Sequence, residues 1–72
     1  MNIENPLLIE ILTTLERIDR ANKAIDFHKG QADPDGNSIQ NYARLKEDFT
    51  QQLAQLLKHL DIVIQFPSDK AA

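Results

Sequence analysis

Residues 30–38 are the one stretch in which turn-forming and helix-breaking residues cluster, with the sequence Gly-Gln-Ala-Asp-Pro-Asp-Gly-Asn-Ser. Proline presets φ, short carboxylates bond nearby backbone amides, and glycine accepts positive φ, so this composition is typical of a tight connection. Helical apolar patterns lead away from it on both sides. The stretch therefore predicts the corner of an antiparallel helical hairpin, with Gly30 left-handed after the first helix and Asn37 or Ser38 capping the second.

The first helix is expected over residues 6–29. Asn5 precedes Pro6, a favourable pair at a helix start because proline lacks an N–H that the helix would leave unbonded there. Apolar residues then recur at intervals of three or four, which places them on one face of a helix. This stripe consists of Leu8, Ile11, Leu15, Ile18 and Ile25, with Asn22 as a polar interruption.

The second helix is expected over residues 38–61, and Lys46 interrupts its apolar stripe. Beyond it, β-branched residues nearly alternate with others, and Pro67 pushes Phe66 toward extended backbone. Residues 62–72 are therefore expected to be an apolar segment that ends in disorder. The stripe of the second helix consists of Tyr42, Phe49, Leu53, Leu56, Leu60 and Val63.

A chain of 72 residues is one small domain, near the size at which a single core becomes marginal. Folding at the corner brings Leu8 level with Leu60 and Ile18 level with Phe49. One such seam leaves apolar side chains on both helices exposed, and pairing two hairpins covers them. We therefore expect an all-α, coiled-coil-like homodimer forming a four-helix bundle, since two-fold symmetry is the commonest closed symmetry.

The interface of this dimer is predicted from the apolar residues that one hairpin cannot cover. They crowd at the end opposite the corner, and the segment of residues 62–66 is expected to cross onto the other chain. The same apolar end could instead bind another protein. The predicted interface residues are Leu7, Leu12, Leu45, Leu57, Ile62, Ile64 and Phe66.

The corner also carries a metal-binding pattern, Asp-Pro-Asp-Gly-Asn at residues 33–37. It resembles the opening of a calcium loop of the EF-hand family, which implies oxygen ligands from Asp33, Asp35 and Asn37. The resemblance covers five residues. Ser38 stands where the loop needs its glycine, and Arg44 stands where it needs a bidentate glutamate. The sequence therefore predicts no metal, with a calcium-responsive hairpin as the alternative.

No catalytic or cofactor site is predicted. The chain has no glycine-rich phosphate loop and no recognisable nucleophile–base pair, and the histidines, His28 and His59, fall near opposite ends of the hairpin. A net charge of −3 with mixed signs argues against nucleic-acid and anionic-membrane surfaces. No apolar run is long enough to span a bilayer, and residues 1–5 do not resemble a secretory signal.

From these observations we expect a cytoplasmic, non-enzymatic interaction or scaffold module whose partner is a second copy of itself. A subunit of a larger assembly with a different protein is the remaining alternative. No nucleic-acid or membrane partner is expected.

Overall fold

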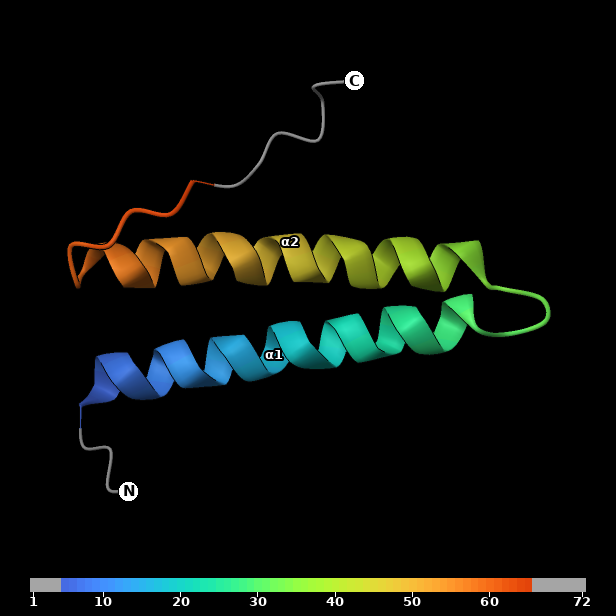
Figure 1. Cartoon of the computed structure of the whole chain (residues 1–72), viewed down its shortest axis with the longest axis horizontal. Coiled ribbons are helices and arrows are strands. Elements are labelled where there is room, and N and C mark those ends of the chain that lie inside the picture. The colour runs from blue at the N-terminus through green and yellow to red at the C-terminus, as the bar shows by residue number, and fades with distance from the viewer. Residues whose placement is uncertain (1–4, 66–72) are drawn as a thin grey trace.

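The computed structural model describes residues 5–65, which form two α-helices joined by a short corner. Helix α1 spans Pro6–Lys29 and helix α2 spans Gly36–Lys58. The helices lie side by side and antiparallel, with the corner at one end and an open end opposite it (Figure 1). The prediction of an all-helical hairpin is confirmed.

The ends of α1 are set by local hydrogen bonds. Asn5 is the cap, and its side-chain oxygen accepts a hydrogen bond of 2.9 Å from the backbone amide of Leu7. At the other end, the left-handed conformation expected for Gly30 is wrong, because its φ is −80°. The Gly30 amide donates to the carbonyls of Asp26 and Phe27, so the last turn tightens without reversing its hand.

Helix α2 begins two residues before the expected start because Asp35 caps it, in place of Asn37 or Ser38. One Asp35 oxygen accepts hydrogen bonds from the backbone amides of Asn37 and Ser38, at 3.1 and 3.4 Å. The other accepts a 2.8 Å hydrogen bond from the Ser38 hydroxyl. The cap position therefore goes to the residue whose two oxygens satisfy three donors of the first turn.

Helix α2 ends at Lys58, three residues before the expected end. The Ile62 amide donates to the Leu57 carbonyl and the Asp61 amide to that of Lys58, at 3.1 and 3.0 Å. Asp61 has a φ of 59°, so these bonds form a left-handed stop of the kind usually made by glycine. Residues 62–65 are not helical and turn back along α2 (Figure 1). Val63 is 76% exposed and does not continue the stripe of α2.

The seam between the helices is rotated around α1 relative to the expected stripe: it keeps Ile11, Ile18 and Ile25 and replaces the two leucines. Thr14 and Ala21 are each 4% exposed, whereas Leu8 and Leu15 remain 42% and 46% exposed. Small side chains suit the place where two helix backbones come closest, since the spacing of helix axes depends on the residues at the contact. The buried and half-buried positions along this seam are Leu7, Ile11, Thr14, Ile18, Ala21, Ile25 and His28.

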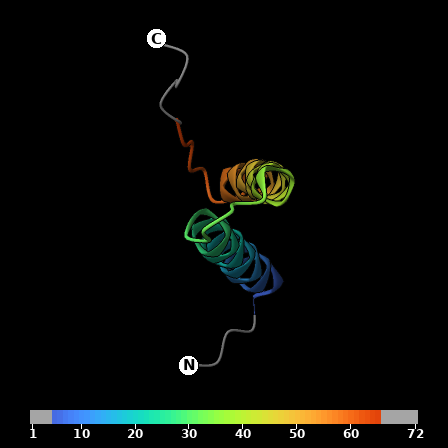
Figure 2. The same cartoon turned by 90° about the vertical axis from the view of Figure 1, so that its right-hand side faces the viewer.

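Helix α2 contributes only half-buried residues to the seam, and none that is fully buried. The Arg17 guanidinium lies 5.9 Å from the centre of the Phe49 ring, and the His28 ring stacks on Tyr42 at 5.8 Å. Both contacts lie within one helical turn of the expected register. Figures 1 and 2 show α1 slanting away from α2 toward the open end. The hairpin is therefore closed best near its corner.

Candidate interaction surface

The predicted interface residues do not form one surface. Leu12 and Leu45 are 48% and 44% exposed, but they lie on opposite sides of the seam. Leu7 and Leu57 are half-buried. Beyond α2, Ile62 and Ile64 are 44% and 38% exposed on the segment that follows Asp61. Phe66 lies outside the described residues.

The most regular exposed apolar feature is a line of three leucines on α1, which we call the leucine strip. Leu8, Leu12 and Leu15 follow the four-three spacing of a second seam and are 42%, 48% and 46% exposed. On a helix of 3.6 residues per turn, Leu15 lies about 100° around the axis from Thr14. Helix α1 therefore carries two apolar lines, and the hairpin covers only one of them.

The strip continues toward the corner as a polar line with the same spacing, made of Asp19, Asn22 and Asp26. Asp19 forms an ion pair of 2.9 Å with Lys23 on the same helix. Both of these side chains are well exposed, so the ion pair adds little stability. The strip and its continuation thus form a line along α1 that is apolar toward the open end and polar, with two carboxylates, toward the corner.

The two sides of the hairpin are distinguished by which residues line its hollows. One hollow is lined by Arg17 and Ala21 of α1 and by Leu45 and Phe49 of α2. We call the side of the hairpin on which this hollow opens the arginine side. The other side of the hairpin carries the leucine strip of α1, and we call it the leucine side. The residues of α2 on that side follow from a rotation of about 100° per residue around the helix axis.

Helix α2 presents small, polar and charged groups of both signs to the leucine side. A shallow hollow there is lined by Ala43, Lys46, Glu47, Thr50 and Gln51. The Thr50 hydroxyl donates a 2.7 Å hydrogen bond to the Lys46 carbonyl, so its polar group is satisfied by its own helix. Nearer the open end, Ala54 and Leu57 follow and are half-buried.

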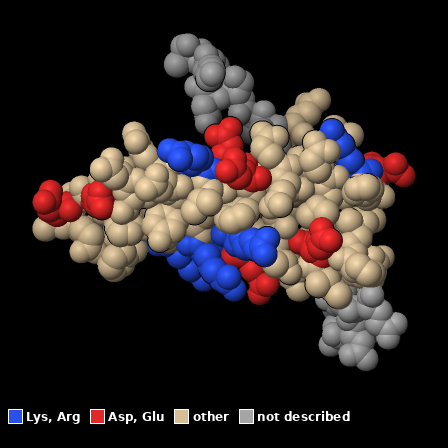
Figure 3. All heavy atoms as spheres, turned by 180° about the vertical axis from the view of Figure 1, so that it is seen from behind, with Lys and Arg blue, Asp and Glu red and all other residues tan. Residues whose placement is uncertain are grey.

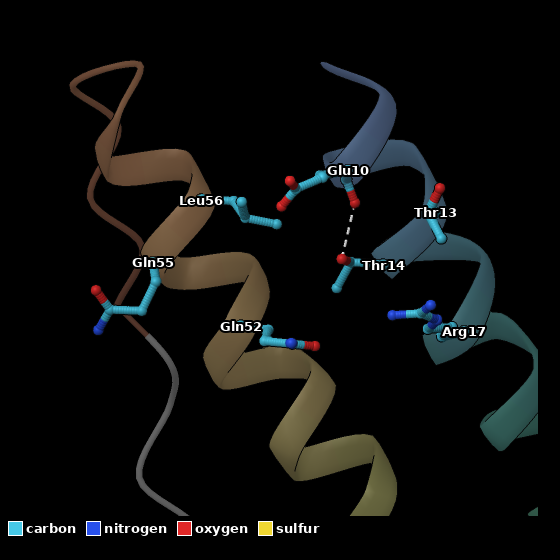
Figure 4. Close-up of a pocket in the computed structure, with 7 residues that line it drawn as sticks. All are labelled: Glu10, Thr13, Thr14, Arg17, Gln52, Gln55 and Leu56. Atoms are coloured by element: carbon cyan, nitrogen blue, oxygen red, sulfur yellow. Dashed lines mark hydrogen bonds between the residues drawn. The ribbon is translucent and has the colours of Figure 1, made fainter. Parts of the chain in front are cut away.

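The arginine side carries both apolar and charged groups. Seen from behind, Lys and Arg side chains gather midway along α1 (Figure 3). A hollow of about 370 Å³ lies between the helices, and Glu10, Arg17 and Gln52 point into it (Figure 4). The hydroxyl of Thr14, at its base, donates a 2.8 Å hydrogen bond to the Glu10 carbonyl. This hydroxyl is therefore satisfied by a carbonyl of its own helix.

The corner residues expected to bind a cation in the alternative prediction are Asp33, Asp35 and Asn37. Asp35 serves as the cap of α2, and the hydrogen bond from the Ser38 hydroxyl lowers the pKa of its carboxyl most strongly. Hydrogen bonds to its charged form have this effect. Within residues 5–65, no group of three or more His, Cys, Asp or Glu side chains is placed to hold a metal ion.

The sequence pattern alone did not identify Leu8 and Leu15 as surface residues. Both were expected in the seam, where Thr14 and Ala21 stand instead. The signal that could have found them is the regular four-three series that begins at Leu7 and passes through both small residues. Hydrophobicity favoured the leucine series over this one.

Neither α1 nor α2 is long and apolar enough to cross a bilayer. The chain matches no protein-family model, no curated protein and no solved structure.

Proposed function

We propose that the chain is a homodimeric helical-hairpin module that acts through protein–protein association and not through catalysis. The observation that supports it best is the leucine strip, a second apolar line of α1 that remains 42–48% exposed. Contiguous exposed apolar groups usually mark contact surfaces. A helix with two apolar lines is suited to a bundle in which it has two helical neighbours.

The thinness of the hairpin core also supports association. Among the described residues, Thr14 and Ala21 alone are buried, and both are small. Domains of this size need staples such as disulfides, metals or oligomerisation. The sequence contains no cysteine, which excludes the disulfide. A second hairpin laid on the leucine side supplies apolar burial without lengthening the chain.

The test is the mass of the full chain in solution, measured by sedimentation equilibrium over a range of concentrations. We expect a dimer, with a thermal midpoint that rises with protein concentration because association is linked to folding. A compact, fully helical monomer at micromolar concentration would contradict the proposal.

A matched pair of variants locates the interface. Leu15→Glu places a charge in the leucine strip, whereas Ile9→Glu makes the same change at a residue equally exposed, at 45% against 46%. Ile9 lies about 120° around α1 from Leu15 and is outside the strip. We expect Leu15→Glu to weaken dimerisation by at least about tenfold, since burying the exposed half of a leucine contributes about 1 kcal/mol, each dimer contains two, and the glutamate adds the cost of removing a charge from water. Ile9→Glu should leave dimerisation near that of the unaltered chain, and equal effects of the two changes would place the interface elsewhere.

A further inference from the structure

We infer that the second copy binds with its open end beside this open end, so that each leucine strip packs against α2 of the other chain. This inference rests on the proposed homodimer and adds its orientation. In such a dimer the two-fold axis runs parallel to the helices. It differs from the inverted arrangement, in which the corner of one hairpin lies beside the open end of the other.

The levels of the residues along the hairpin support this orientation. Glu10 and Leu56 line one hollow, and Arg17 lies over Phe49, so the leucine strip is level with the last turns of α2. A two-fold axis parallel to the helices leaves the position of every residue along the hairpin axis unchanged, so residues level with each other in one chain are also level with their copies in the other. The strip of one chain then meets Ala54 and Leu57 of the partner subunit, both of which are on the leucine side.

The charges on the leucine side agree with the same orientation. Continuing the register of the Arg17–Phe49 and His28–Tyr42 contacts places Lys46 near the level of Asn22, which lies between Asp19 and Asp26 in the sequence of α1. These acidic residues are each about one turn of helix from the level of Lys46, roughly 5 Å along the axis. A lysine side chain spans that distance. In the aligned dimer, Lys46 of the partner subunit therefore lies beside the Asp26 carboxylate and near the ion pair that Asp19 forms with Lys23.

The inverted arrangement loses both the apolar contact of the leucine strip and the charge contact of Lys46. When inverted hairpins overlap along their full length, α1 runs antiparallel to the second copy of α1, and the leucine strip faces the polar line from Asp19 to Asp26 of the other helix. Lys46 lies close to the middle of α2, which spans Gly36–Lys58, so inversion also brings Lys46 toward its own copy. Like charges facing each other and leucines against carboxylates both disfavour an interface.

A third arrangement keeps the open ends together but places the two α1 helices in direct parallel contact. The leucine strips then meet each other, but Asp26 faces Asp26 of the partner subunit. Alternating α1 with α2 of the other chain avoids this repulsion and leaves every neighbouring pair of helices antiparallel.

Orientation can be measured with one spin label per chain. The chain has no cysteine, so Asp33→Cys in the exposed corner gives a unique labelling site. Pulsed electron spin resonance on the dimer should give a distance below about 25 Å, since neighbouring helix axes lie about 8–10 Å apart and label linkers add to this. Inversion would separate the labels by about the length of a helix, roughly 35 Å or more.

The possible results separate this inference from the proposed function. A long label distance in a sample that sediments as a dimer overturns the orientation and leaves the homodimer intact. A monomeric mass removes both. The charge contact is tested with Lys46→Asp, which should weaken the dimer roughly tenfold, and with Lys46→Asp combined with Asp26→Lys, which should restore most of the lost affinity. An unchanged affinity of the single variant would show that Lys46 does not meet a carboxylate of the second copy.

Discussion

Replacing Ala21 by leucine tests which face of α1 packs against α2. Ala21 is 4% exposed and lies on the seam, so three added carbons must either push the helix backbones apart or displace the side chains around the hollow beside Leu45 and Phe49. Extra methylenes in a packed core cost about 1–3 kcal/mol, because neighbouring side chains and backbone must shift. For so small a chain, the urea dependence of the unfolding free energy is about 1 kcal/mol per molar. The urea midpoint should therefore fall by roughly 1–3 M.

The measurement is urea unfolding followed by helical circular dichroism at one fixed protein concentration. Ala24→Leu is the matched control, because Ala24 lies one turn further along α1 and is only half-buried. Leucine and alanine are both good helix formers, so the difference between the two variants reports on packing. A midpoint of Ala21→Leu equal to that of the unaltered chain would refute the seam and favour the face that contains Leu15 and Asn22.

Two further predictions concern the helix ends. The pKa of the Asp35 carboxyl is lowered from 3.8 in the folded chain, so its contribution to stability is present above the unfolded pKa and is lost as the pH falls through the folded pKa. Asp35→Asn keeps the cap but removes the titrating group, so its melting temperature should fall less than that of the unaltered chain between about pH 5 and pH 2. An identical fall in both chains would contradict this. Asp61 has a φ of 59°, where a non-glycine residue is strained, so Asp61→Gly should raise the melting temperature and Asp61→Val should lower it, with the opposite order excluding the left-handed stop.

The hairpin could be predicted from the sequence because its signals are local. Asn5 and Pro6 mark a helix start through their own backbone chemistry, and the turn residues of the corner need no distant partner. The exact caps were harder. Asp35 and Asn37 both suit a cap, and the choice depends on which side chain reaches the Ser38 hydroxyl and amide.

The seam of α1 could not be predicted in the same way. Leu15 and Thr14 are adjacent, and hydrophobicity alone places the leucine inside. The structure places Thr14 there because the two backbones approach closely and the threonine hydroxyl is satisfied by the Glu10 carbonyl. Interhelical distance is a property of two elements together, so no single-helix pattern contains it. This is also why Leu8 and Leu15 were not recognised as part of the candidate surface.

The short corner and the His28–Tyr42 stack beside it have a kinetic consequence. Closing a loop of a few residues is fast, so contacts next to the corner can form first and the rest of the seam can close progressively after them. At the open end α1 slants away from α2 (Figure 1). This end is then the last part of the hairpin to form its interhelical contacts and the first to lose them. Amides in the helix interior near the corner should accordingly exchange with solvent more slowly than those near Leu12, which are also hydrogen-bonded within α1. In the proposed dimer, a newly made chain would keep its leucines uncovered longest at the very place where a second chain arrives, so that encounter completes folding.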